Sequence, residues 1–104
     1  MRTTSTETFP DENIDEVLGI VRGNTVRARN VGRDITQSLR QVVGGELKAY
    51  SSLMTDTRDE AMERMEQEAE ELGADAVVNV RFTTSQVAGN SAEILVYGTA
   101  VTLE

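Results

Sequence analysis

Apolar residues recur every three or four positions between Leu47 and Leu72, and acidic side chains fill the positions between them. This spacing predicts a helix over residues 47–72, because residues three and four apart share one helix face. At 1.5 Å per residue the helix would be about 39 Å long. Gly73 follows directly and suits the left-handed conformation that ends many helices. The side chains on this helix face form a stripe that consists of Tyr50, Met54, Thr57, Ala61, Met65, Glu68 or Ala69, and Leu72.

Beyond Gly73 the period changes from 3.6 to two, which predicts a strand with one apolar face. Gly89 and Asn90 occupy the tip of a predicted turn over residues 87–91. A final strand is predicted over residues 92–103, and apolar side chains lie on both of its faces. The apolar face of the strand after Gly73 consists of Ala76, Val78, Val80 and Phe82.

The first part of the chain has a weaker pattern. Residues 1–13 are polar and acidic around Pro10, and they predict a flexible arm that only a partner would order. Residues 14–21 place apolar side chains on both faces of a strand. Gly23-Asn24 can then turn the chain, and residues 25–29 can continue as extended structure.

Asn30 is a candidate N-cap for a first helix that runs to about Val43. Gly44-Gly45 would end it. The expected fold is therefore an α+β domain over residues 14–104, a β-α-α-β-β subunit with a three-stranded, mainly antiparallel sheet and one long helix. Helices can cover one face of such a sheet, but the first and last strands are apolar on both faces. Because large exposed apolar patches are unusual on monomers, we expect a homo-oligomer.

Composition excludes several classes of function. The chain has 104 residues, no cysteine, no histidine and a formal charge of -8. It therefore lacks a disulfide framework, a thiolate nucleophile and the usual base near neutral pH. No serine or threonine can be assigned a base, so we expect no catalytic residue and no cofactor. The negative charge disfavours nucleic acid, and no apolar stretch is long enough to span a membrane. We expect a cytoplasmic protein, because residues 1–6 lack the apolar core of a secretory signal.

The charge is unevenly distributed. Residues 22–48 hold six basic and two acidic side chains, for a sum of +4, and residues 56–71 hold two basic and eight acidic ones, for a sum of -6. These segments can be two solvated helix faces, or unlike surfaces that meet head to tail in a ring. The acidic excess fits a high-salt cytoplasm or an ordinary acidic protein. Asp56, Asp59, Glu60 and Glu63 share a helix face and could gather around a hard cation.

A candidate site for a small anionic ligand lies at Gly44, Gly45 and Glu46, between the two predicted helices. Backbone N–H groups and the start of the second helix favour an anion there, with Arg33 nearby in sequence. Tight packing of one helix against the next explains the glycines equally well. Two interpretations of Asp34 stay open: it caps or bridges to an arginine of a neighbouring subunit, or it forms a charged pore rim with Arg33. Tyr50 is expected in the core with its hydroxyl at the edge.

An ordered run of short motifs resembles the YbjQ family, a group of small bacterial and archaeal proteins often labelled "putative heavy-metal-binding". The resemblance spans residues 14–103 and implies an α+β subunit assembled into a ring-shaped homopentamer. This chain has neither the thiolate nor the imidazole ligands that heavy metals prefer, so its residues give the metal label little support. The motifs are Gly19-Ile-Val-Arg-Gly23, Asn30-Val-Gly-Arg-Asp34, Val43-Gly-Gly-Glu46, Lys48-Ala-Tyr50, Leu53, Arg58, Ala61, Met65, Leu72-Gly-Ala-Asp-Ala-Val77 and Tyr97-Gly-Thr-Ala-Val101.

Three functions remain open on these grounds. The first is a non-catalytic, homo-oligomeric scaffold or small-ligand-binding module. The second is a protein that binds a metal cation through carboxylates. The third is an enzyme whose site, near Gly44-Gly45, is shared between subunits.

Overall fold

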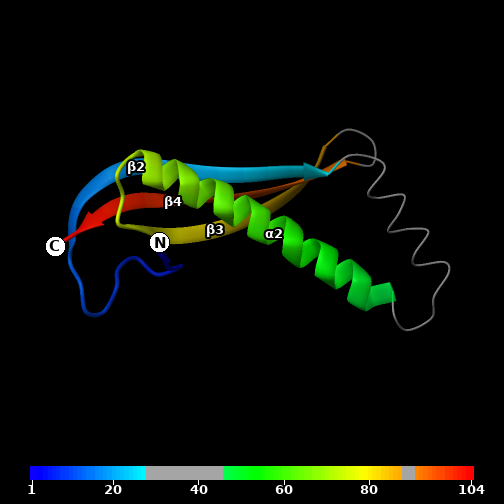
Figure 1. Ribbon diagram of the computed structural model, residues 1–104, viewed down its shortest axis with the longest axis horizontal. Coiled ribbons are helices and arrows are strands. Elements are labelled where there is room, and N and C mark those ends of the chain that lie inside the picture. Colours follow the sequence, from blue (N-terminus) through cyan, green and yellow to red (C-terminus); the bar gives the residue numbers. More distant parts are fainter. Residues whose placement is uncertain (28–45, 88–90) are drawn as a thin grey trace.

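The computed structural model describes residues 1–27, 46–87 and 91–104, with the backbone alone at residues 27, 46–53, 86–87 and 91–92. Within this part of the chain the fold is α+β, as predicted, with one long helix packed across one face of a mixed sheet (Figure 1). The first helix predicted over residues 30–43 lies outside the described residues. The elements are β1 (Arg2–Thr3), β2 (Ile14–Arg27), α2 (Glu46–Glu71), β3 (Ala76–Val87) and β4 (Ser91–Leu103).

The sheet has four strands in the order β1-β3-β4-β2, not the three that the sequence pattern predicts. β4 lies in the middle and pairs antiparallel with both β2 and β3, whereas β1 pairs in parallel with β3. The fourth strand comes from residues 1–13, which we expected to form a flexible arm. Thr3 lies opposite Val77, and the amide of Thr4 donates to the carbonyl of Val77 at 3.0 Å.

β2 continues straight through Gly23-Asn24, so the turn predicted there is wrong. Gly23 lies opposite Val96 and Asn24 opposite Leu95 in an unbroken antiparallel ladder. The glycine serves a different purpose, because α2 crosses β2 at this point. A Cβ on residue 23 would overlap the backbone carbonyl of Ala61. Only a residue without a side chain allows the helix and the strand to approach this closely.

The long helix begins and ends one residue before the predicted limits. Ala61, Met65 and Ala69 of the predicted stripe are fully buried against the sheet. Gly73 has a φ of 80°, as expected of a residue that ends a helix in the left-handed conformation. The amide of Ala74 donates to the carbonyl of Ala69 at 3.1 Å, which satisfies one carbonyl at the helix end.

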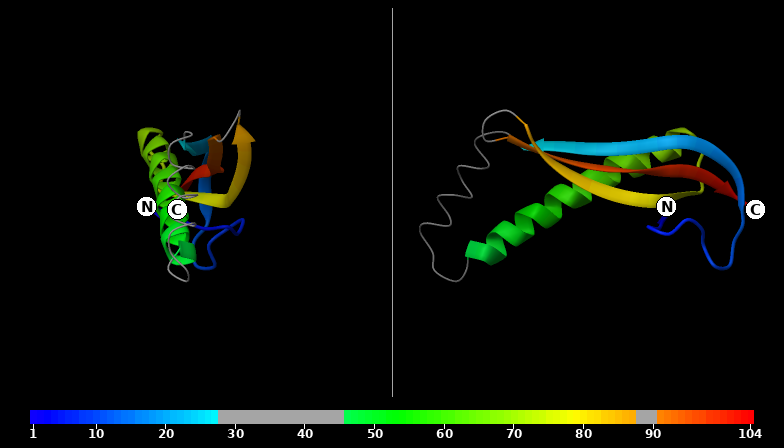
Figure 2. Two further views of the ribbon diagram at one scale, coloured as in Figure 1. Left: turned by 90° about the vertical axis from the view of Figure 1, so that its right-hand side faces the viewer. Right: turned by 180° about the vertical axis from the view of Figure 1, so that it is seen from behind.

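Two apolar clusters lie on opposite faces of the sheet. The larger one fills the space between α2 and the sheet. The smaller one joins Phe9 to Ala76, Val78 and Val101 on the other face. Figure 2 shows α2 on one side of the sheet. The larger cluster consists of Val21, Ala61, Met65, Ala69, Val77, Ile94, Val96 and Ala100.

Candidate functional site

Most of the candidate ligand site lies outside the part of the chain that the structure describes. This holds for Arg33, Asp34, Gly44 and Gly45. Glu46 is the first residue of α2, and Tyr50 lies one turn further along the helix, with the backbone alone described at both. The anion site at the Gly-Gly turn therefore stays a prediction.

The outward face of α2 is acidic. Since Ala61, Met65 and Ala69 point into the core, residues such as Glu63, Glu66 and Glu70 lie on the opposite side of the helix. These three carboxylates and the amide of Gln67 line a surface hollow. Other acidic residues on or beside this outward face are Asp56 and Asp59.

The four carboxylates considered for a cation do not form a metal cluster. Glu60 instead forms an ion pair with Arg64, with 2.6 Å between Oε1 and Nη2. The other guanidinium nitrogen of Arg64 donates to the backbone carbonyl of Asn24, which ties α2 to β2. Among the residues that the structure describes, no three His, Cys, Asp or Glu side chains gather closely enough to hold a metal ion.

The face of the sheet turned away from α2 carries exposed apolar side chains. Val17 is 64% exposed, Ile20 76% and Val26 50%, all from β2. Tyr97 of β4 is 40% exposed. Residues that pair across neighbouring strands have their side chains on the same face of the sheet. Val17, Ile20 and Val26 pair with Val101, Thr99 and Glu93 of β4. These β4 residues are an even number of positions from Tyr97, so all of these side chains lie on the same face as Tyr97. We call this surface, made by Val17, Ile20, Val26, Tyr97 and their neighbours, the open face.

Two arginines flank the tyrosine in the middle of the open face. Arg22 of β2 and Arg81 of β3 both lie opposite Tyr97, one on each side of the central strand. Arg81 donates to the backbone carbonyl of Ser5 at 2.7 Å, so its guanidinium is directed toward the N-terminal segment. At one end of the same face Glu93 accepts a hydrogen bond from Asn24.

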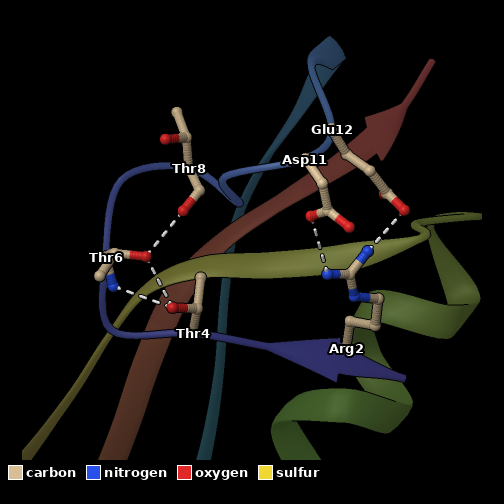
Figure 3. Close-up of polar contacts among 6 residues, drawn as sticks. All are labelled: Arg2, Thr4, Thr6, Thr8, Asp11 and Glu12. Atoms are coloured by element: carbon tan, nitrogen blue, oxygen red, sulfur yellow. Dashed lines mark hydrogen bonds and ion pairs between the residues drawn. The ribbon is translucent and has the colours of Figure 1, made fainter.

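Residues 2–6 lie along the edge of β3, and Phe9 covers one end of the open face. Local polar contacts fix this segment (Figure 3). Arg2 forms an ion pair with Glu12 at 2.6 Å, and its guanidinium carbon lies 4.2 Å from the centre of the Phe9 ring. Thr6 donates through Oγ1 to the carbonyl of Thr8 at 2.7 Å. Phe9 is thereby buried over Ala76 and Val101.

The sequence pattern did not assign Phe9 to the core, although one aromatic residue in a polar segment is a usable signal. Its ring covers only the end of the face near Val101, so the apolar β2 residues and Tyr97 stay exposed in the described chain.

No helix in the described ranges has both the length and the apolar character needed to cross a membrane. The fold and its two faces define a small α+β protein.

The chain belongs to the YbjQ family, as the resemblance indicated. The family model, described as "Putative heavy-metal-binding", matches residues 1–104. A UPF0145 protein of Halorubrum lacusprofundi is 64% identical over 103 residues, which is 99% of either chain. A UPF0145 protein of Archaeoglobus fulgidus is 57% identical over 100 residues, 96% of this chain and 93% of the relative. A UPF0145 protein of Hahella chejuensis is 53% identical over the full length of both.

The fold also matches a solved structure. A crystal structure from Pediococcus pentosaceus, of a protein with unknown function in the DUF74 family, superimposes with a TM-score of 0.66. The match covers 100% of this chain and 98% of the other at 16% identity. At this identity the likeness concerns the fold alone.

Proposed function

We propose that this protein is a subunit of a homo-oligomer that has no catalytic site and acts as a scaffold or as a module for a small anionic ligand. The observation that carries the proposal is the open face of the sheet. Burial of one exposed Val or Ile side chain contributes about 1.5–3 kcal/mol, so covering Val17, Ile20 and Val26 would strongly favour association. Such a patch on an isolated subunit would promote aggregation instead.

The proposed assembly is a pentameric ring in the cytoplasm. The number five rests on the family resemblance, and the cytoplasmic location rests on the sequence features described above. A ring brings the chain segments around Gly44 and Gly45 of several subunits into a repeated arrangement. A small anion held there, with Arg33 nearby in sequence, is the ligand class that we propose.

Light scattering after size-exclusion chromatography tests the proposal. We expect the wild-type chain to elute as a multiple of 11.4 kDa at micromolar concentration. Ile20→Glu places a charge in the middle of the open face and should give monomers. Glu7→Gln, at an exposed position in the N-terminal segment, is the matched control and should leave the mass unchanged. A monomeric wild-type protein would refute the proposal.

A metal-binding function is the second candidate, favoured by the description of the family. Its ligands would be carboxylates such as Glu63 and Glu66, which line the hollow on α2 but form no metal cluster within the described residues. Oxygen ligands suit Mg²⁺, Ca²⁺ or Mn²⁺ better than soft metals. Calorimetric titration of the assembled protein with each of these ions, and with Zn²⁺, tests it. Saturable binding that Glu63→Gln/Glu66→Gln abolishes would support a carboxylate site, and the absence of saturable binding would exclude it.

A further inference from the structure

The described chain presents two surfaces of opposite character on opposite sides of the sheet. The centre of the open face combines apolar side chains with Arg22 and Arg81. The outward face of α2 carries Glu63, Glu66 and Glu70. Within one subunit these surfaces cannot meet, because α2 packs on the other side of the sheet from the open face.

We propose that the outward face of α2 from a second copy of this chain docks on the open face. This inference rests on the proposed homo-oligomer and identifies its contact surfaces. The glutamates of the second copy would lie near Arg22 and Arg81, and the helix would cover Tyr97 and Ile20. In a protein with a formal charge of -8, the two arginines mark a part of the surface that an acidic helix of another copy can approach with less repulsion than elsewhere.

The dimensions of the two surfaces are compatible. α2 has 26 residues and is about 39 Å long at 1.5 Å per residue. β2 has 14 residues and is about 46 Å long at roughly 3.3 Å per residue. A helix of this length can therefore follow most of the exposed strand. The long methylene stems of glutamate side chains can contact apolar residues while the carboxylates reach the arginines.

Docking of this kind is heterologous, because each copy contributes a different surface to each contact. A row of subunits joined by heterologous contacts has a free open face at one end and a free helix face at the other. The row ends only when rotation between copies brings the last subunit back to the first, which closes a ring. The charge pattern of a single chain thus favours a ring over a two-fold dimer.

Charge reversal tests the contact directly. We compare the variants Arg22→Glu/Arg81→Glu and Glu63→Arg/Glu66→Arg with a chain that carries all four substitutions. Glu7→Arg/Glu104→Arg, at two exposed positions that the proposed contact does not use, controls for the change in net charge of Glu63→Arg/Glu66→Arg. Because Arg81 also donates to Ser5, Arg22→Glu alone provides a variant that keeps this contact. Circular dichroism establishes that each variant is folded.

Association is measured by sedimentation in about 0.1 M KCl, where the Debye length is about 10 Å and charge pairing is only partly screened. We expect each double reversal to raise the dissociation constant of assembly about a hundredfold. Arg22→Glu alone should raise it less. The fourfold variant should recover assembly to within about tenfold of wild type, because it restores opposite charges across the contact.

Two results would overturn the inference while the homo-oligomer stands. One is unchanged assembly of the folded double reversals, and the other is a fourfold variant that is as dissociated as they are. A wild-type protein that is monomeric in this assay would overturn the inference and the proposed function together.

Discussion

Gly23 of β2 lies against the backbone of Ala61 in α2 so closely that a methyl group on residue 23 would overlap the Ala61 carbonyl oxygen. The Cβ would also meet the amide nitrogen of Met65. Since backbone atoms of a helix cannot rotate away as a side chain can, the helix itself would have to move. This contact sets the distance between α2 and the sheet, and with it the position of the acidic helix face relative to the open face.

Replacement of Gly23 by alanine should therefore be strongly destabilising. We expect a loss of about 3 kcal/mol in the free energy of unfolding, at the upper end of the range for overpacked sites. Asn24→Ala, at the exposed neighbouring position, should cost about 0.5 kcal/mol or less. Urea denaturation of both variants measures the difference. Equal stabilities would contradict the close approach of α2 to β2.

Gly73 offers a test of the helix end. Its φ of 80° is costly for a residue with a Cβ, although no atom lies within 4 Å of the position that a Cβ would take. Gly73→Ala should thus lower the free energy of unfolding by about 1 kcal/mol through backbone strain alone. Gly73→Asn should cost less, because asparagine tolerates the left-handed region better. Thermal denaturation distinguishes the two variants, and an alanine variant as stable as wild type would disprove a left-handed Gly73.

Phe9 should hold the N-terminal segment on the sheet. In Phe9→Ala we expect the free energy of unfolding to fall by about 2 kcal/mol, which is less than for a phenylalanine in a main core, because the smaller cluster covers only one end of the sheet. Hydrogen exchange of the Thr4, Asn79 and Val80 amides, which bond across β3 and the segment, should become faster. Glu7→Ala is the control. Unchanged exchange at these three amides would mean that Phe9 does not anchor the segment.

Salt should stabilise the protein. The acidic face of α2 and the formal charge of -8 create repulsion that dissolved ions screen. We expect the melting temperature to rise between about 0.1 M and about 2 M KCl, and the rise to be smaller in Glu71→Gln/Glu104→Gln, which lowers the negative charge at two exposed positions outside the proposed contact. A melting temperature that is independent of salt, or equal slopes for both proteins, would argue against this electrostatic origin.

Local pattern predicted the parts of the fold whose burial is periodic. The stripe through Ala61, Met65 and Ala69 placed the long helix to within one residue at each end. The strand predicted over residues 92–103, apolar on both faces, matches β4 to within one residue. In both elements the apolar side chains needed for burial follow one another closely along the chain, so the sequence alone indicates them.

The failures concern contacts between residues far apart in the chain. Gly23-Asn24 has the composition of a turn, but its glycine is required by the backbone of Ala61, which sequence neighbours do not indicate. β1 has only two residues, Arg2 and Thr3, and pairs with β3 more than seventy positions later. No alternation of apolar residues marks such a short strand, so residues 1–13 gave the pattern of an arm.

The candidate site was predictable in part. Apolar residues on both strand faces correctly indicated an exposed second face, on which Ile20 and Tyr97 are now placed. The pairing of Arg22 and Arg81 with Tyr97 depends on strand register and on the irregularity between Val78 and Arg81, which one sequence does not specify.

The mass of the native particle is the most direct test of the central claim that the open face is covered by another copy of the chain. Light scattering of the wild-type protein at micromolar concentration should give a homo-oligomer, and the pentameric ring corresponds to five times 11.4 kDa. Ile20→Glu should reduce this mass to that of one subunit. A wild-type particle of 11.4 kDa would contradict the account.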